Sequence, residues 1–324
     1  MGDVSAHVSV IIPTYNRLFQ VCKSIESVLA QSYKNYEIIV IDDGSTDGTG
    51  EHLKEKYGSL IRYYYQKNKG PAAARNKGIN QASHDLIAFL DSDDIWLPEK
   101  LERQLALMSD MSVVLSYTNW KDHKEQQYPD YFSSIDLFFE EENIIVDDPV
   151  KLLSRTTGSG ISTITCMARK SSIVHVGCFD ERMKIAEDVR LWHRLGFEGK
   201  YGVLADVLSE RGWSDDKEHL SEPLSLDKKF ESARNRLEIY LETYARAIEA
   251  DKNVQDNIRY HIQHCLLEIV KCQTLRGNFS LARRNALEAF ICYPKGKYCI
   301  ESLIAFICPQ VYKINNRQLI KYHE

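Results

Sequence analysis

Hydrophobic residues alternate between two patterns along the first third of the chain. Continuous runs of apolar, often β-branched residues predict strands buried on both faces; they lie at Val8–Ile12, Glu37–Ile41, Ile61–Tyr65, Leu86–Leu90 and Val113–Tyr117. Between them, apolar positions with helical spacing predict helices at Leu18–Gln31, Asp47–Tyr57, Pro71–Ala82 and Pro98–Met108. This alternation predicts an α/β domain, with a mostly parallel sheet and helices on both of its faces.

The alternation weakens after Tyr117. Asp122–Asp148 is strongly acidic, with Lys124 as its one basic residue, and predicts a long mobile insertion. Beyond it we expect a strand at Ile161–Ala168, a helix at Glu187–Phe197 and a final edge strand at Val203–Leu208.

The last hundred residues show helical periodicity alone. Four helices are predicted, at Lys228–Ala250, Val254–Arg276, Ser280–Cys292 and Tyr298–Ile307. The stretch from Gly277 to Pro294 matches the second helix of a tetratricopeptide unit, but a stable array needs at least three copies, so a helical hairpin in a bundle is the better interpretation. We expect two domains, residues 1–224 and an all-helical region at 225–324.

Composition narrows the class of protein. The net charge of −5 combines an acidic N-terminal region with a basic C-terminal one, which suggests two different roles. No apolar run is long enough to span a bilayer, the start has no secretory signal, and Ala6 stands where a myristoylation signal needs Ser or Thr. The eight cysteines form no C-x-x-C pair, which argues against a zinc or redox motif and favours free thiols in a reducing cytosol.

Polar turns follow three of the predicted strands, where ligands bind in open parallel sheets. They are Pro13–Asn16, Asp42–Ser45 and Asp91–Asp94. These turns lack the glycine pattern of a dinucleotide fold or a P-loop. Acidic turns instead suit Mn²⁺ or Mg²⁺, which binds few protein carboxylates and otherwise the phosphates of a substrate. The alternative for the third turn is a solvated helix cap, with Asp94 capping the helix that begins at Pro98.

Five segments in order extend these turns into a longer pattern. They are VSVIIPTYNR (Val8–Arg17), EIIVIDDGSTDGT (Glu37–Thr49), GPAAARNKGI (Gly70–Ile79), LIAFLDSDDIWLPEKL (Leu86–Leu101) and EDVRLWHRL (Glu187–Leu195). Over residues 7–212 the chain resembles the family-2 glycosyltransferases, inverting nucleotide-diphospho-sugar enzymes. The resemblance implies their Rossmann-like GT-A fold, here followed by a helical C-terminal extension.

The resemblance assigns the donor side of a site. It implies that Pro13, Thr14 and Tyr15 line the nucleotide pocket and that Asp43 accepts a hydrogen bond from a pyrimidine N–H, the basis of uridine preference. Arg75 would reach the base or the diphosphate. Asp91 would contact ribose or metal, and Asp93 would coordinate a metal that bridges the diphosphate. From the residues alone there are two alternatives: Asp43 only forms a turn, and Arg75 is a charge on the surface of a helix.

The resemblance also assigns the acceptor side. Asp188, with Glu187 as its neighbour, matches the catalytic base, and Phe179-Asp180-Glu181 matches the lead-in to its helix; a solvated helix start is the alternative. Trp192 would pack under the acceptor site or belong to the core. The Gln-x-x-Arg-Trp sequence of processive synthases is absent. The motif after the last strand is altered, so His219 is a weak candidate for the histidine sometimes assigned to metal or diphosphate.

These residues lead to one expected function. It is metal-dependent, inverting transfer of a single sugar from a UDP-sugar to a saccharide or lipid-linked saccharide acceptor, in cell-surface polysaccharide or glycolipid assembly. The acidic insertion would form part of an acceptor lid. We expect a cytoplasmic protein that binds no nucleic acid. Two options stay open: a homo-oligomer, and peripheral docking of the basic C-terminal region on the inner face of a membrane.

Two other functions stay open at this point. The chain could be a degenerate, non-catalytic transferase domain that holds partners through its helical C-terminus, although Asp91, Asp93 and Asp188 are intact. A nucleotidyltransferase is a nearer rival, but its glycine-rich phosphate loop is missing.

Overall fold

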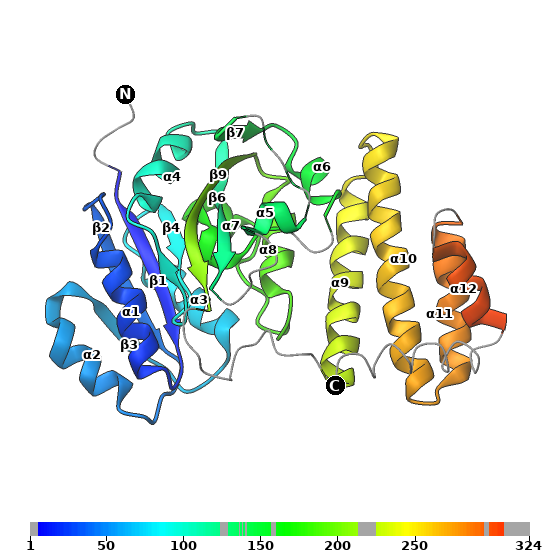
Figure 1. Ribbon diagram of the computed structural model, residues 1–324, viewed down its shortest axis with the longest axis horizontal. Helices are drawn as coiled ribbons and strands as arrows, with labels where there is room; N and C mark the ends of the chain where they lie inside the picture. The colour runs from blue at the N-terminus through cyan, green and yellow to red at the C-terminus, as the bar shows by residue number, and fades with distance from the viewer. Residues whose placement is uncertain are drawn as a thin grey trace. The chain divides into compact units, whose positions relative to one another are not determined.

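The computed structural model describes residues 6–123, 129–135, 137, 139, 141–156, 160–212, 225–294 and 298–307. The chain divides into two compact units, Met1–His219 and Leu220–Glu324. The first unit carries one sheet and the second carries helices (Figure 1).

The described residues of the first unit form a nine-stranded sheet of order β3-β2-β1-β4-β8-β6-β9-β5, with β7 also paired to β9. The parallel half consists of β1 (Val8–Thr14), β2 (Tyr36–Asp42), β3 (Arg62–Tyr65) and β4 (Leu86–Phe89). Short β8 (Met167–Arg169) runs antiparallel to both β4 and β6 (Val113–Asp122). β9 (Lys200–Arg211) is parallel to β6 and antiparallel to β5 (Ile95–Trp96) and β7 (Asn143–Val146).

Alternate residues of the central strands enter two separate cores, which explains their continuous apolar sequence. Val10 and Ile12 of β1 pack with α1 (Leu18–Leu29), α2 (Thr49–Tyr57) and α4 (Lys100–Met108), while Ile11 points to the other face. That second core includes α3 (Pro71–Gln81), α6 (Pro149–Leu153), α7 (Lys170–His175) and α8 (Glu187–Leu195). The predicted α/β sheet with helices on both faces is therefore confirmed (Figure 1).

Two predicted strands differ from the structure. Most of Ile161–Ala168 is not extended, because the turn η2 (Thr163–Thr165) is closed by local hydrogen bonds from Thr165 Oγ1 to the Ser162 carbonyl and from the Cys166 amide to the Thr163 carbonyl. The strand predicted at Val203–Leu208 is not an edge: β9 pairs with β6 on one side and with β5 and β7 on the other.

The described part of the acidic insertion folds against the sheet, so the prediction of a long mobile insertion is wrong for that part. It contains α5 (Tyr131–Ser134) and β7, which extends the sheet beside β9. Phe132 is 3% exposed and packs edge-to-face on Tyr117, and its amide donates to Asn119 Oδ1 at 3.1 Å. Aromatic burial therefore anchors a segment whose acidic composition had suggested a loop.

The second unit consists of α9 (Leu226–Arg246), α10 (Lys252–Leu275), α11 (Phe279–Cys292) and α12 (Tyr298–Ile307). Helix α10 packs against both α9 and α11. Ala282, Ala286 and Ala289 of α11 are fully buried, and their small side chains allow close helix packing. In the described residues no helix is long and apolar enough to cross a membrane.

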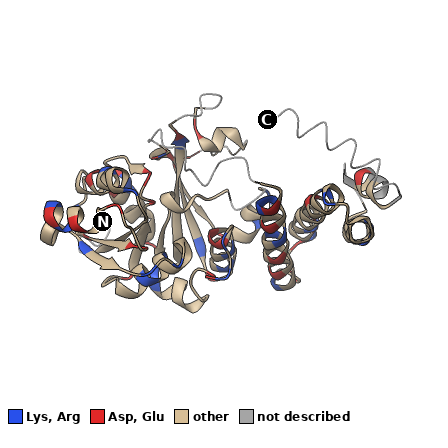
Figure 2. Cartoon of the chain, turned by 90° about the horizontal axis from the view of Figure 1, so that it is seen from below, with Lys and Arg blue, Asp and Glu red and all other residues tan. Residues whose placement is uncertain are grey.

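Charges of both signs are mixed along these helices (Figure 2). Lys271 pairs with Glu268 and Glu301, Arg284 pairs with Glu288, and Arg276 pairs with Asp227. Several basic residues expected to face a membrane are thus engaged in ion pairs on their own helical unit.

Close packing of α3 on β1 gives the first prediction. A Cβ at Gly78 would lie 2.4 Å from Ile11 Cγ2, so Gly78→Ala must displace a core side chain. We expect a loss of about 1–3 kcal/mol in the free energy of unfolding, measured by urea denaturation. Gly196→Ala is the matched control, because its φ is −61° and the added Cβ would meet atoms no closer than 3.4 Å. Equal stability of the two variants would contradict this account.

Candidate active site

The turns after β1 and β2 are tied together by backbone and side-chain hydrogen bonds. The Asp43 amide donates to the Thr14 carbonyl at 2.8 Å, and the Thr46 amide donates to Asn16 Oδ1 at 2.7 Å. Asn16 adopts a left-handed conformation with φ of 50°, which asparagine tolerates better than most residues. Pro13 and Thr14 are buried beside this junction, whereas Tyr15 is 48% exposed.

Asp43 orders the loop that leads into α3. Its carboxylate accepts from Gln66 Nε2 at 2.7 Å, from the Lys69 amide at 2.9 Å and from the Gly70 amide at 2.8 Å. A carboxylate has about four lone-pair positions, so these bonds leave capacity for a further donor. Nearby, Thr14 Oγ1 is buried and has no hydrogen-bond partner within the described part of the chain. This edge of the sheet thus offers acceptor atoms that a bound ligand could satisfy.

Arg75 on α3 connects the turn after β4 to the start of α8. Its side chain is 7% exposed; Nη1 lies 2.9 Å from Glu187 Oε1 and Nη2 lies 2.7 Å from Asp91 Oδ1. The two carboxylates keep its guanidinium fully charged by raising its pKa against the effect of burial. The surface-charge alternative for Arg75 is therefore wrong.

The acidic turn after β4 holds its carboxylates in different surroundings. Asp93 pairs with Arg17 Nη1 at 2.7 Å. Asp94 is buried, and its Oδ1 accepts from the Gly212 amide at 2.8 Å; burial and the charges of Asp93 and Asp91 raise its pKa well above the ordinary range. Asp94 does not cap a helix, because α4 begins at Lys100 with Glu99 at its N-cap position.

The carboxylate oxygens of this turn fit a divalent cation that takes its other ligands from the phosphates of a bound substrate. The described residues contain no cluster of three or more His, Cys, Asp or Glu side chains able to hold a metal by themselves. Asp91 and Asp93 offer hard oxygen atoms, and Mg²⁺ and Mn²⁺ commonly take one or two protein carboxylates together with substrate phosphates. The residues therefore fit a metal that binds with a diphosphate.

Glu187 and Asp188 form the first turn of α8, where Glu187 is buried and Asp188 is half-buried. Glu187 is 8% exposed, and Asp188 Oδ2 accepts from Thr163 Oγ1 at 3.0 Å. Burial raises the pKa of both carboxyl groups, and the charge of Asp188 raises that of Glu187 further, while Arg75 lowers both. The preceding Ala186 adopts a left-handed conformation with φ of 67°, which strains a residue other than glycine. Carboxyl groups with raised pKa values beside a strained backbone are typical of functional sites.

The segment before α8 is locked to α3 by Asn76. Its side-chain Nδ2 donates to the Phe179 carbonyl at 2.9 Å, and its Oδ1 accepts from the Phe179 amide at 3.0 Å. Phe179 packs edge-to-face against Phe89 and Trp192, and the Arg75 guanidinium lies 5.5 Å from its ring centroid. Trp192 is fully buried in this aromatic cluster, so it belongs to the core.

The predicted residues and the residues found at the site are not the same set. His219 lies outside the described residues. Arg17, Asn76 and Thr163 were missed as parts of the site. Arg17 ends the first motif, and Asn76 follows Arg75 within the third motif, which are usable signals. Thr163 has no sequence feature that distinguishes it from other polar residues.

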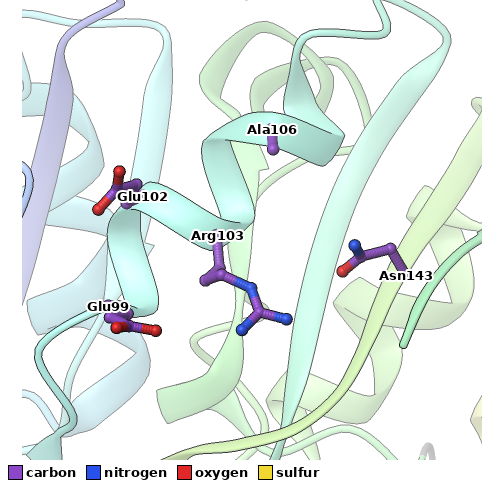
Figure 3. A pocket seen from close by; sticks show the side chains of 5 residues that line it. All are labelled: Glu99, Glu102, Arg103, Ala106 and Asn143. Atoms are coloured by element: carbon purple, nitrogen blue, oxygen red, sulfur yellow. The ribbon is translucent and has the colours of Figure 1, made fainter.

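A hollow of about 420 Å³ lies apart from these residues. It is lined by Glu99, Glu102, Arg103, Ala106 and Asn143, and Arg103 and Asn143 lie on opposite sides of it (Figure 3). Arg103 is held by Asp206 at 2.6 Å. None of the predicted site residues lines it, so it is not the candidate active site.

Comparison with known proteins bears on the first unit. Residues 9–176, just over half of the chain, match the family model for glycosyl transferase family 2. An uncharacterised glycosyltransferase of Rickettsia felis is 36% identical over 204 residues, which cover 63% of this chain and 32% of that protein. The Escherichia coli UDP-Glc:alpha-D-GlcNAc-diphosphoundecaprenol beta-1,3-glucosyltransferase WfgD is 43% identical over 115 residues, covering 35% of this chain and 46% of that protein. This chain thus spans less than half the length of either relative.

Solved structures share the fold. Staphylococcus aureus TarS 1–349 in complex with UDP-GlcNAc has a TM-score of 0.60 at 19% identity and covers 87% of this chain and 89% of that one. The mannosyltransferase PcManGT of Pyrobaculum calidifontis, in complex with GDP-Man and Mn²⁺, has a TM-score of 0.55 at 14% identity. The match covers 99% of this chain and 87% of that one. The predicted GT-A type of fold is confirmed.

The buried acidic pair predicts a pH-dependent stability. A carboxyl group whose pKa is higher in the folded chain binds its proton more tightly there, so the free energy of unfolding falls as the pH rises from about 4.5 through the folded-state pKa. Glu187→Gln removes this contribution, about 1.4 kcal/mol for each unit of pKa shift. We expect a shallower fall between pH 4.5 and 7.5, measured by urea denaturation.

Glu26→Gln is the control for this measurement. Its exposed carboxylate accepts a hydrogen bond from Lys56, which lowers its pKa, so the variant should steepen the fall slightly. Identical pH profiles for the wild type and Glu187→Gln would contradict the assignment.

Proposed function

The chain belongs to glycosyl transferase family 2, and from that membership we propose that it transfers a single sugar from a UDP-sugar to an acceptor hydroxyl, with inversion at the anomeric carbon. The reaction would serve the assembly of a cell-surface polysaccharide or glycolipid. Asp188 would act as the base, and Asp91 and Asp93 would hold a divalent cation.

The bridge made by Arg75 is the observation that carries this proposal. It brings Asp91, at the end of β4, and Glu187, beside Asp188, onto one guanidinium. An inverting transferase needs a donor diphosphate and a base within one site, because the acceptor oxygen must attack the anomeric carbon from the side opposite the leaving group. The bridge supports the proposal because Asp91 and Glu187, the neighbour of Asp188, bind the same guanidinium group.

Residues of the first two turns support a nucleotide on the donor side. Pro13 and Thr14 are buried beside exposed Tyr15, which is free to flank a base. Asp43 retains acceptor capacity for a pyrimidine N–H. A uridine nucleotide is also favoured by the relatives, because the WfgD name specifies UDP-Glc and the TarS structure holds UDP-GlcNAc.

A cation at Asp91 and Asp93 would supply Lewis-acid stabilisation of the negative charge on the departing diphosphate. The solved mannosyltransferase with Mn²⁺ supports a metal of this type. Arg75 stays charged and adjacent to Asp91, so it would orient that carboxylate and contribute positive charge toward the phosphates.

Asp188 would take the proton of the acceptor hydroxyl. The acceptor oxygen forms a bond to the anomeric carbon as its proton moves to the carboxylate, and the bond between that carbon and the UDP oxygen breaks. Burial raises the pKa of Asp188, which makes it a stronger base than an exposed aspartate.

The acceptor would be a saccharide or a lipid-linked saccharide, the class given in the name of WfgD. Membrane docking of the C-terminal unit, a cytoplasmic location and oligomerisation stay predictions. The ion pairs of Lys271, Arg276 and Arg284 leave fewer free cations for docking than the sequence had suggested.

The test of this function is metal-dependent UDP release. The protein is incubated with UDP-glucose, UDP-galactose, UDP-GlcNAc or GDP-mannose, with Mn²⁺ or with EDTA, and the free nucleotide is measured. We expect release from a UDP-sugar in Mn²⁺ alone, and a loss of more than about 100-fold together with weaker UDP binding in Asp93→Ala. Asp206→Ala, which removes the Asp206–Arg103 pair, is the matched control and should resemble the wild type. UDP affinity unchanged by both EDTA and Asp93→Ala would exclude the metal site.

The base gives a separate prediction. Asp188→Asn keeps the size of the side chain and an acceptor oxygen for Thr163 but cannot take a proton. We expect transfer to fall by about 10²–10⁴-fold while UDP and Mn²⁺ still bind, the opposite pattern to Asp93→Ala. An α-linked donor should give a β-linked product by NMR. Full activity in this variant, or an α-linked product, would refute the assignment.

A further inference from the structure

The turn η2 reaches the start of α8 through one hydroxyl group. Thr163 is 4% exposed, and its Oγ1 donates to Asp188 Oδ2 at 3.0 Å. The other carboxylate oxygen, Oδ1, accepts from the Val189 amide at 2.8 Å. The terminal torsion of aspartate is soft, so a hydrogen bond on each oxygen is needed to fix the plane of the carboxylate. Thr163 thus determines which way Asp188 faces.

Two buried side chains hold the residues that follow Thr163. Trp96 Nε1 donates to the Ile164 carbonyl at 2.8 Å, and Gln104 Nε2 donates to the Thr165 carbonyl at 2.9 Å. Trp96 is 3% exposed and Gln104 is fully buried. Successive carbonyl groups of η2 are therefore anchored to β5 and α4.

Lys100 orients both of these donors. It is fully buried, its Nζ lies 4.2 Å from the centroid of the Trp96 ring, and it donates to Gln104 Oε1. Because the oxygen of the Gln104 amide accepts from Lys100, its NH₂ group faces the carbonyls of Thr165 and Ser116, to which Nε2 donates at 2.9 and 3.0 Å. Burial lowers the pKa of Lys100 to about 7, which is the signature of an unfavourable environment for the charge. An apolar residue would fill this position at a lower desolvation cost, so stability alone does not account for a lysine here.

We propose that Thr163 is a positioning residue for Asp188, and that Lys100, acting through Trp96 and Gln104, holds η2 in the conformation that presents the Thr163 hydroxyl. This inference rests on the proposed role of Asp188 as the base. The hydroxyl occupies one lone pair of Oδ2, stabilises the anionic carboxylate and turns the remaining lone pairs toward the acceptor.

The test compares two buried threonines whose hydroxyl groups both donate a hydrogen bond. Thr163→Val removes the donor to Asp188 with little change in shape, whereas Thr243→Val on α9 removes a hydroxyl that bonds to the Ile239 carbonyl of its own helix. With the nucleotide sugar that gives the most UDP release in Mn²⁺, we expect Thr163→Val to lower kcat by about 10-fold to 100-fold, as for a lost hydrogen bond to a charged group. The KM for the donor should not change, Thr163→Ser should restore kcat, and Thr243→Val should behave as the wild type.

A second readout does not depend on turnover. Protein labelled with ¹³C at the aspartate carboxyl carbon is titrated by NMR, with the Asp188 signal assigned from its absence in Asp188→Asn. Loss of the hydrogen bond should raise the pKa of Asp188 in Thr163→Val, and Thr243→Val should leave it unchanged. Lys100→Met should shift it in the same direction by a smaller amount.

The outcomes separate this inference from the proposed function. An unchanged Asp188 pKa and an unchanged kcat in Thr163→Val, with Asp188→Asn inactive, would overturn the positioning role alone. Full activity in Asp188→Asn would overturn the base itself, whatever the threonine variants do. A shift in Thr163→Val without one in Lys100→Met would overturn the support assigned to Lys100.

Discussion

The guanidinium of Arg75 is buried between carboxylates from two distant segments, and the geometry of the site follows from this pairing. Asp91 lies at the end of β4 and Glu187 at the start of α8, and both bind Arg75 within 3 Å. Removing either partner would leave a charge in the interior without full compensation, which costs far more than the net gain from an intact pair. The end of β4 and the helices α3 and α8 are therefore held in fixed relative positions. The double hydrogen bond between Asn76 and Phe179 also fixes the segment before α8 to α3.

Several features around this charge work against stability. Ala186 and Asn16 adopt left-handed conformations, and Asp94 and Lys100 are buried in positions that disfavour their charged forms. If the fold were the only requirement, a residue without this conformational or desolvation cost would be favoured at each position. Ala186 lies directly before Glu187 and Asp188, and Asp94 lies directly after Asp91 and Asp93; this distribution supports a chemical role for that edge of the sheet.

The sequence predicted the parts of the molecule that depend on local pattern. β1, β2, β3 and β4 were located because alternate residues enter two cores, and the polar turns were located because they end those strands. Non-local pairing could not be derived in this way. β7 has a half-exposed pattern within an acidic stretch, and its pairing with β9 follows from partners some sixty residues apart. Thr163 was read as part of a strand because β-branched residues favour strands. In the structure the Thr165 hydroxyl stabilises a turn, and the Thr163 hydroxyl bonds to Asp188.

The charge balance of the site explains why a cation would be attracted to it. Arg17 and Arg75 face Asp91, Asp93, Glu187 and Asp188, so the carboxylates outnumber the guanidinium groups. Repulsion within this group contributes to the raised pKa of Glu187 and Asp188, which can be relieved by protonation or by added positive charge. A divalent cation that arrives with a diphosphate supplies positive charge to the carboxylates and gives the phosphates ligands of the opposite sign. The same excess of carboxylates would disfavour a diphosphate that binds without a metal, so metal and nucleotide are expected to bind cooperatively rather than independently.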